Sequence, residues 1–573
     1  MQTPQSSLVD ALVELRAAAV GMRLGLPIDG APAAVATQHE LVGQIDDYLL
    51  PRLRQLDAPL LMVVGGSTGA GKSTLVNSLV GAAVSAAGVL RPTTRAPVLV
   101  CNPGDVDWFT GDRVLPGLPR STGAQGGHHA LHVVPHPQVP QGLALLDAPD
   151  IDSVVTENRE LSRQLLAAAD LWLFVTTAAR YADAVPWDLL HAARARSTAL
   201  AVVLNRAPPG SGPEVSAHLR EMLQDNGLGD SSLFVVDESV LDERGMLADA
   251  SIAPVRGWMN TLGADAEARA AVVRGTLVGA LDSIPQRVNT LANAAEAQRS
   301  AAAALLAEAH AAYARARDEV DEGVTSGALL RGEVLARWQD FVGTGEFMRS
   351  LESRIGVLRD RLRAAFSGRP PAGTELKAAL ESSVESLVRA AADRAADRTY
   401  ESWSASAAGR ALVGSGAAHL ARASTTLPAA VEREVRAWQG HVLELVSQEG
   451  AGKRTAARFL SYSVNAAGLA VMVTVFAHTG GLTGGEVAVA GGTSALGQKL
   501  LEAVFGDQAV RALAESARTD LLARVESVLA AERERFDERA IAAVAGADAA
   551  AQLRAAGALV GAARRGAFAA SRP

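Results

Sequence analysis

The chain has 573 residues, too many for one hydrophobic core, so two or three domains are expected. Its net charge of −8 argues against a general nucleic-acid binder, and its one cysteine, Cys101, excludes an internal disulfide and suits a reducing cytosol. Alanine is abundant and aromatic residues make up only 4%, which favours helix over most of the chain. The first residues lack the basic segment and apolar core of a signal peptide, so none is expected.

Residues 1–58 are predicted to form two helices. Apolar residues recur at helical spacing over 6–24 and again over 35–56, and Gly25, Pro27 and Pro32 interrupt the pattern between them. Two such helices cannot bury their apolar stripes alone. We therefore expect them to pack on a helical stalk supplied by the far end of the chain.

Residues 59–263 are predicted to form an α/β domain with a mainly parallel sheet. Apolar runs of strand length alternate with helical segments, and nearly continuous runs suit strands that are buried on both faces. The segment 130–134 is expected to add an antiparallel strand. The predicted buried strands are Leu60–Val64, Pro97–Cys101, Leu143–Leu146, Leu171–Val175, Leu200–Leu204 and Leu233–Val236.

The stretch after the first predicted strand fits the P-loop pattern G-x-x-x-x-G-K-[ST] from Gly66 to Ser73. Its glycines let backbone N–H groups point at phosphate oxygens, and the helix that follows adds its positive end. Lys72 can reach the β and γ phosphates, and the Ser73 hydroxyl can ligate Mg²⁺. The predicted nucleotide-binding residues of the loop are Gly66, Ser67, Thr68, Gly69, Ala70, Gly71, Lys72, Ser73 and Thr74.

Two further segments complete the predicted site. The strand Leu143–Leu146 runs into Asp147, as a Walker-B strand does, and Asp147 would hold Mg²⁺ through water. The loop 89–97 can supply a hydroxyl to the metal, with Thr94 as the first choice and Thr93 as the second. The predicted metal-binding residues are Ser73, Thr94 and Asp147, and the predicted catalytic residues are Lys72, Thr94 and Asp147.

Together these motifs resemble the GTPase domain of bacterial dynamin-like proteins. The likeness rests on Gly71–Gly81, Arg91–Val100 and Leu145–Asp150, and it is specific over about residues 58–180. It implies GTP and Mg²⁺ as cofactors, Thr94 as the switch threonine and Asp147 as the Mg²⁺-associated acid. It also implies a GTPase that couples nucleotide state to self-association and to membrane binding or remodelling.

Two places, Asp150 and the base-reading motif, depart from that family's pattern, and Ile151 bears on hydrolysis. Asp150 stands where the family has glycine, which puts a carboxylate near the γ-phosphate position. Ile151 follows instead of a water-orienting glutamine, so slow basal turnover that rises on self-assembly is expected. In place of the guanine-reading motif, Asn205 and Arg206 can frame the base, but Pro208 cannot pair with guanine. A P-loop ATPase therefore stays open as an alternative.

From residue 264 onward the chain is predicted to be helical, with a stalk over 264–452 and a C-terminal stalk helix and basic tail over 507–573. The helices are expected at 265–325, 328–366, 374–408, 410–448, 453–478, 486–505 and 508–547. The basic stretch 552–568 is expected to lie on a membrane surface or to fray.

Residues 453–506 form an apolar, glycine-rich segment without a charged residue from Phe459 to Gly485. We predict a helical hairpin that dips into one leaflet, which places the protein in the cytoplasm, attached peripherally or monotopically to the inner face of the cell membrane. The alternative is a hairpin buried inside the helical bundle, because a helix that is apolar all round fits both environments.

Other interpretations stay open at this stage. A soluble GTPase switch that recruits a protein or ribosomal partner would share the nucleotide motifs. Arg91 or Arg95 could stabilise transition-state charge, although a plain surface role is favoured. His128, His129, His132 and His136 crowd one stretch, but the prolines beside the last two favour a solvated turn over a metal site. No nucleic-acid partner is expected.

Overall fold

The computed structural model divides the chain into two compact units. Unit 1 comprises Met1–Met22, Gly30–Glu296 and Gly546–Pro573, and unit 2 comprises Arg23–Asp29 and Ala297–Ala545. The residues described are 4–86, 96–111, 114–115, 118–121, 130–150, 156–196, 198–208, 210–326, 372–414, 416–451 and 506–569.

Unit 1 contains an eight-stranded sheet in the order β3-β4-β2-β5-β1-β6-β7-β8. Each of the predicted apolar runs lies in a strand of this sheet, which confirms the α/β class. The strands are β1 (Leu60–Gly66), β2 (Val98–Cys101), β3 (Arg120–Ser121), β4 (Leu131–Pro135), β5 (Leu143–Asp147), β6 (Leu171–Thr177), β7 (Ala199–Ala207) and β8 (Ser232–Asp237).

The sheet changes direction once. Strands β5, β1, β6, β7 and β8 are parallel, whereas β2 pairs antiparallel with β5. The added strand predicted over 130–134 forms as β4 and runs opposite to the parallel core, but it bonds in parallel to β2. The parallel core brings the carboxyl ends of five strands to one edge, which is where open α/β sheets bind their ligands.

Helices cover both faces of the sheet because successive side chains of a strand point to opposite sides. Leu61 and Val63 of β1 pack with α5 to α8, whereas Met62 and Val64 pack with α4, α9 and the start of α10. The helices are α4 (Lys72–Val80), α5 (Val106–Thr110), α6 (Thr156–Ala167), α7 (Ala184–Ala195), α8 (Gly212–Asp225), α9 (Asp249–Ala264) and α10 (Ala266–Thr325), and the short 3-10 helix η2 spans Pro103–Asp105.

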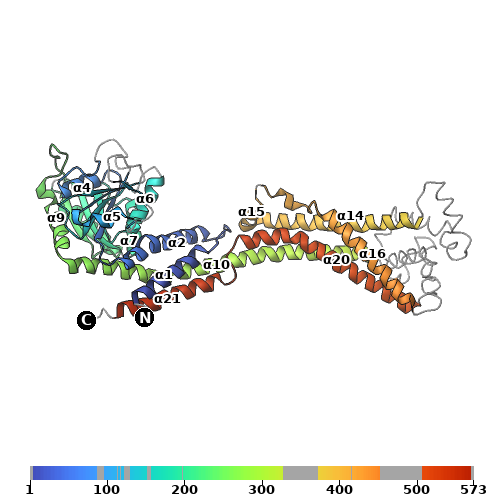
Figure 1. Ribbon diagram of the computed structural model, residues 1–573. Helices are drawn as coiled ribbons and strands as arrows, with labels where there is room; N and C mark the ends of the chain where they lie inside the picture. The colour runs from blue at the N-terminus through green and yellow to red at the C-terminus, as the bar shows by residue number, and fades with distance from the viewer. Residues whose placement is uncertain are drawn as a thin grey trace, which may run out of the picture. The chain divides into compact units, whose positions relative to one another are not determined.

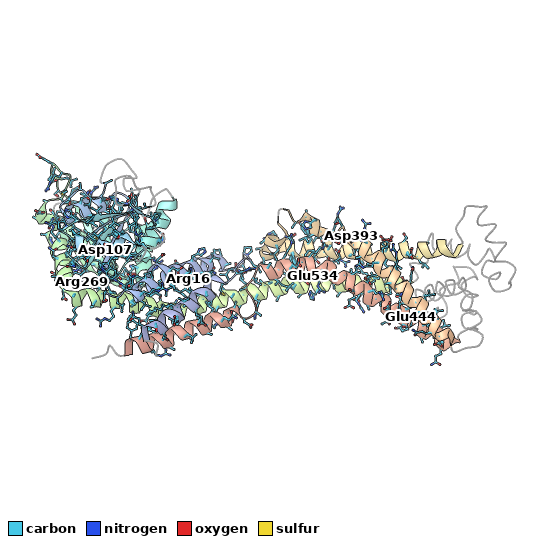
Figure 2. All side chains as sticks on the ribbon, viewed as in Figure 1. Arg16, Asp107, Arg269, Asp393, Glu444 and Glu534 are labelled. Carbon is cyan, nitrogen blue, oxygen red and sulfur yellow. The ribbon has the colours of Figure 1, made fainter. Side chains whose placement is uncertain are left out.

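The N-terminal helices of unit 1 pack with the C-terminal one. Helix α1 (Pro4–Val20) lies along α21 (Ala549–Ala569), and α2 (Ala31–Gln44) continues through the π-helix η1 (Ile45–Leu49) into α3 (Leu50–Arg54) (Figure 1). On α1, Arg16 donates to Asp46 at 2.5 Å (Figure 2). On α21, Arg554 and Arg564 pair with Glu296 and Asp282 of α10. The basic stretch expected to lie on a membrane or to fray is therefore a packed helix.

Unit 2 is helical. Two α-helices and a short 3-10 helix lie where one helix was predicted over 410–448. The segment 297–325 of α10 packs with α14 (Ala372–Ala405), α15 (Ala407–Val413), η4 (Ala418–Ala421), α16 (Leu427–Ala451) and α20 (Asp507–Ala542).

Aromatic side chains anchor the core of unit 2. Trp403 and Trp438 are fully buried, and their indole N–H groups donate to Leu305 O at 3.0 Å and Ala517 O at 2.7 Å. Phe536 stacks edge-on against Trp403 with ring centroids 5.3 Å apart. These contacts join α10, α14, α16 and α20 by groups that are both apolar and hydrogen-bonded.

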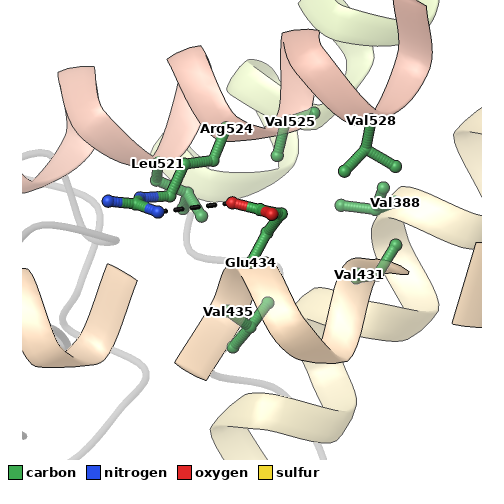
Figure 3. Close-up of a pocket in the computed structure, with 8 residues that line it drawn as sticks. All are labelled: Val388, Val431, Glu434, Val435, Leu521, Arg524, Val525 and Val528. Carbon is green, nitrogen blue, oxygen red and sulfur yellow. Dashed lines mark hydrogen bonds and ion pairs between the residues drawn. The ribbon is translucent and has the colours of Figure 1, made fainter. Parts of the chain in front are cut away.

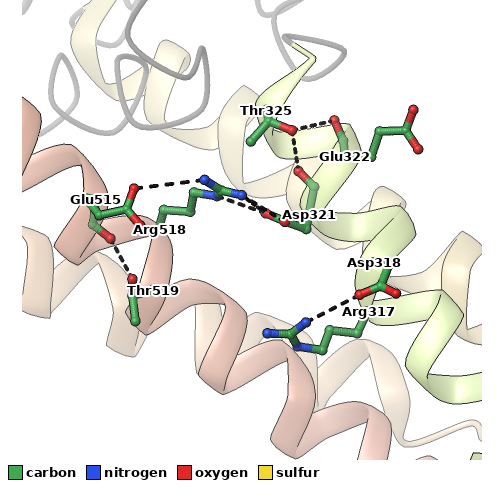
Figure 4. A network of polar contacts seen from close by, with 8 residues as sticks. All are labelled: Arg317, Asp318, Asp321, Glu322, Thr325, Glu515, Arg518 and Thr519. Carbon is green, nitrogen blue, oxygen red and sulfur yellow. Dashed lines mark hydrogen bonds and ion pairs between the residues drawn. The ribbon is translucent and has the colours of Figure 1, made fainter.

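Charged pairs line the outer side of the same bundle. Arg518 of α20 donates through two nitrogens to Asp321 of α10, at 2.7 and 2.8 Å, and also lies 3.9 Å from Glu515 (Figure 4). The two side chains are 29% and 30% exposed. Such half-exposed pairs set the register of neighbouring helices more than they stabilise them.

The predicted hairpin over 453–506 lies outside the described residues, apart from Gly506. Among the helices that the structure does describe, none is both long enough and apolar enough to cross a membrane.

Candidate nucleotide-binding site

The glycine loop from Gly66 to Ser73 joins the carboxyl end of β1 to the start of α4. Gly66 and Gly71 have φ angles of 151° and 88°, which side chains rarely adopt. A Cβ at Gly66 would lie 2.1 Å from Val175 O, and one at Gly71 would lie 2.5 Å from Asn205 Nδ2. Glycine is therefore required at both positions, because the backbone turns against β6 and β7.

The Lys72 ammonium is buried inside this loop. It donates to Gly66 O at 2.8 Å, to Ser67 O at 3.2 Å and to Asp150 Oδ1 at 2.5 Å. The side chains of Lys72 and Asp150 are 4% and 16% exposed. Sequence reasoning placed Asp150 near the γ-phosphate position, and the structure places its carboxylate directly on the lysine.

Asp147, at the end of β5, lies beside the first turn of α4. Its Oδ2 accepts from the Ser73 hydroxyl at 2.6 Å and from the Ser85 hydroxyl at 2.5 Å. The β1–β5 pairing sets this contact, because Val64 lies opposite Asp147 in the sheet. Burial raises the pKa of Asp147, while the two hydroxyls and Lys72 act in the opposite sense. Sequence reasoning missed Ser85, which no local motif marks.

The Ser73–Asp147 pair fits a magnesium ion. Asp147 Oδ1 is buried and has no hydrogen-bond partner among the described residues. Hydroxyl and carboxylate oxygens are the protein ligands that Mg²⁺ prefers, with phosphate and water completing its shell. In the described part of the chain, no group of three or more His, Cys, Asp or Glu side chains is arranged to hold a metal, so this site would need the nucleotide's own oxygens.

Asn205 links the end of β7 to the P-loop. Its amide donates to Ala70 O at 2.8 Å, and its Oδ1 accepts from Arg206 N at 3.0 Å. It is 3% exposed. Arg206 has a φ of 54° and is exposed, and the β7–β8 register shifts here between Leu204 and Ala207. The structure therefore brings Asn205 to the loop and leaves the Arg206 side chain on the surface.

Arg180 is the arginine whose side chain contacts the loop among the described residues. Arg180 follows β6, and its guanidinium donates to Thr68 O at 3.0 Å and to Asp183 at 3.0 Å. Sequence reasoning did not select it. The available signal was its place just after the carboxyl end of a parallel strand, on the edge of the sheet where ligands bind.

Several predicted residues lie outside the described part of the chain. Thr94, with Thr93, Arg91 and Arg95, falls in 87–95, and Ile151 falls in 151–155. His128 and His129 are also outside it, whereas His132 and His136 lie in and just after β4.

One cavity lies away from this site, between α14, α16 and α20 of unit 2 (Figure 3). Its volume is about 10 Å³, which is room for one water molecule and not for a ligand. Its lining is apolar except for the ion pair of Glu434 with Arg524 at 3.3 Å. The lining residues are Val388, Val431, Glu434, Val435, Leu521, Arg524, Val525 and Val528.

The parallel sheet, the glycine loop between β1 and α4, and the acid at the end of β5 define a P-loop domain of the α/β class joined to a large helical region. No family model matches the chain, and no curated protein matches its sequence.

Solved structures of bacterial dynamins are similar to the chain. Two belong to an oligomerised bacterial dynamin pair described as a mechanism for the long-range sensing and tethering of membranes; each is 10% identical, with a TM-score of 0.38. They cover 92% and 94% of this chain and 91% and 96% of their own. The bacterial dynamin GTPase LeoA from ETEC is 12% identical with a TM-score of 0.23, covering 99% of this chain and 94% of its own. The geometry of the P-loop, and not these similarities, supports the function proposed next.

Proposed function

We propose that the protein binds and hydrolyses a nucleoside triphosphate at the loop Gly66–Thr74, with GTP favoured over ATP. The observation that carries the proposal is the contact between Ser73 and Asp147, which comes from two neighbouring strands and their loops. A serine at the start of the P-loop helix and an acid at the end of the adjacent strand are the pair that holds Mg²⁺ in P-loop enzymes. If the glycine turn bound no ligand, the buried Asp147 carboxylate, with one oxygen left without a hydrogen bond, would only be unfavourable.

The loop amides, Lys72 and Asn205 have different tasks in this mechanism. The backbone N–H groups of the loop and the N-terminus of α4 bind phosphate oxygens. Lys72 neutralises charge on the β and γ phosphates as the bond to the γ-phosphoryl group breaks. Asn205 holds the loop in place through Ala70 O, so that these donors are oriented before the substrate arrives.

Mg²⁺ would be held by Ser73 directly and by Asp147 through water, with Thr94 as the third proposed residue. When bound, the metal would supply positive charge that offsets the negative charge of the phosphate oxygens. Ser85 keeps the Asp147 carboxylate oriented toward Ser73. Water attack would proceed without a glutamine, since Ile151 occupies that place, and turnover is therefore slow.

The preference for guanine rests on the resemblance of the motifs to bacterial dynamin-like GTPases. Asn205 and Arg206 are the proposed base-side residues, and Pro208 offers no carboxylate to guanine. Competition of a labelled triphosphate by GTP and by ATP tests this directly. Equal or stronger competition by ATP would indicate that the protein is a P-loop ATPase and not a GTPase.

By the same resemblance, we propose that nucleotide state is coupled to self-association and to membrane binding through the apolar stretch 459–498. The motifs of the nucleotide domain and the charge-free run from Phe459 to Gly485 support this. Flotation with anionic liposomes, with and without GTP, tests the membrane part. Absence of binding, together with no effect of deleting 459–498, would leave a soluble GTPase switch that recruits a protein partner.

A further inference from the structure

We propose that Asp150 determines how the site discriminates between a nucleoside triphosphate and the corresponding diphosphate. The inference rests on the proposed function and concerns a residue that the motif does not include. The Asp150 carboxylate accepts a hydrogen bond from the Lys72 ammonium, the group that a triphosphate needs.

All three N–H donors of the Lys72 ammonium have acceptors within the chain. An ammonium has three N–H donors, and they meet two loop carbonyls and one carboxylate. The carbonyls of Gly66 and Ser67 belong to the end of β1 and the loop itself, so they are held by the sheet. Asp150 is therefore the acceptor that has to leave when the γ-phosphoryl group binds to Lys72.

The position of Asp150 is on the γ-phosphate side of the loop. Asp150 follows Asp147 by three residues, and Asp147 contacts Ser73, the pair that would hold Mg²⁺ beside the phosphates. An anionic oxygen 2.5 Å from the ammonium fills the space of a phosphoryl oxygen. Two anions cannot share that position without strong repulsion.

The ion pair of Lys72 with Asp150 is also shielded from solvent. Its two side chains are 4% and 16% exposed, so solvent screens the charges weakly. A triphosphate must break this pair to bring its γ-phosphoryl group to the ammonium, whereas a diphosphate reaches Lys72 only through its β-phosphate and has no γ-phosphoryl group to compete with the carboxylate. Asp150 therefore weakens triphosphate binding selectively.

The test measures equilibrium binding of GTPγS and of GDP, both with Mg²⁺, to the full chain and to Asp150→Asn and Asp150→Gly. Asp107→Asn is the matched control, because it removes the same charge from an exposed position on α5 of the same unit (Figure 2). Thermal unfolding of each variant establishes that it is folded. Two different substitutions keep the test valid if one of them does not fold.

We expect both Asp150 variants to bind the triphosphate at least ~10-fold more tightly, with the diphosphate affinity changed less than ~3-fold, as removal of a like charge implies. The control should change neither affinity. Equal changes for both nucleotides, no change, or weaker triphosphate binding would overturn this inference and leave the proposed function intact. If the parent and all variants bind no nucleotide, the proposed function fails, and this inference fails with it.

Discussion

Arg52 of α3 and Asp170, the residue before β6, form a buried ion pair that joins the N-terminal helices to the sheet. Arg52 Nε donates to Asp170 Oδ1 at 2.9 Å, and the side chains are 6% and 3% exposed. Asp170 also accepts from Leu61 N at 2.8 Å, and its backbone carbonyl accepts from Thr276 of α10. Asp170 thus bonds groups from three separate segments of unit 1, two through its carboxylate and one through its backbone carbonyl.

Asp170→Asn should lower the free energy of unfolding by about 3–5 kcal/mol, because it leaves the Arg52 guanidinium buried without its counter-charge. Denaturant unfolding of the full chain, followed by tryptophan fluorescence, measures the loss. Asp46→Asn is the control, since the pair of Asp46 with Arg16 is 33% and 42% exposed and should contribute less than ~1 kcal/mol. Similar losses in the two variants would contradict the structural role given to Asp170.

Lys72→Ala should weaken triphosphate binding by at least ~100-fold, because charge-assisted hydrogen bonds to two phosphate groups are lost. Titration with a fluorescent GTP analogue measures the change. Lys453→Ala serves as a control that removes the same charge outside the P-loop domain. A Lys72→Ala protein that retains the parental affinity would refute the whole assignment of the loop.

Asp147→Asn should raise the Mg²⁺ concentration needed for half-maximal hydrolysis, or lower the turnover, by about 10–100-fold. The substitution should cost little thermal stability, because burial already disfavours the charged carboxyl, as its raised pKa indicates. Steady-state hydrolysis over a Mg²⁺ titration, paired with a melting curve, separates the two effects. A large drop in melting temperature with unchanged Mg²⁺ dependence would make Asp147 a purely structural residue.

Asn205→Ala should weaken nucleotide binding about 10-fold, since the loop loses the amide that holds Ala70 O and a buried carbonyl is left unpaired. Ser211→Ala, a few residues further on, removes only an exposed hydroxyl bonded to Pro208 O and should have no effect. Affinities for GTP and ATP should be compared in both variants. An unchanged affinity in Asn205→Ala would exclude its proposed role in preorganising the loop.

Asp47 should make stability depend on pH between about 4 and 6. Burial raises its pKa to about 6, against the opposing effects of Gln164 and Arg196. Because the folded state holds the proton more tightly than the unfolded state, this residue's contribution to stability falls as pH rises through that window. Melting temperatures of the parent, Asp47→Asn and the exposed control Asp57→Asn measure it. Only Asp47→Asn should flatten the profile and raise stability at neutral pH.

Local patterns were enough to predict the glycine loop between β1 and α4 and the strands around it. Gly66, Gly71, Lys72 and Ser73 occupy fixed positions because the turn from β1 into α4 needs particular φ angles and particular side chains at fixed spacing. Asp147 was predictable for the same reason, since it ends an apolar strand. The helical character of unit 2 followed from composition.

Contacts between distant segments were beyond these patterns. The pairing of Asp150 with Lys72, of Ser85 with Asp147 and of Arg180 with Thr68 joins residues 78, 62 and 112 positions apart. The packing of α21 on α1 likewise joins the two ends of the chain. It explains why the stretch 552–568, which was expected to lie on a membrane surface or to fray, forms a packed helix.

The amino-acid sequence by itself determined which segments form the sheet, the phosphate loop and the helices, because backbone geometry and apolar periodicity are local properties. Only the tertiary structure decided what each charged group meets, including that the carboxylate of Asp150 lies on Lys72. Strand order and helix packing bring such groups together, and no spacing along the chain encodes those distances.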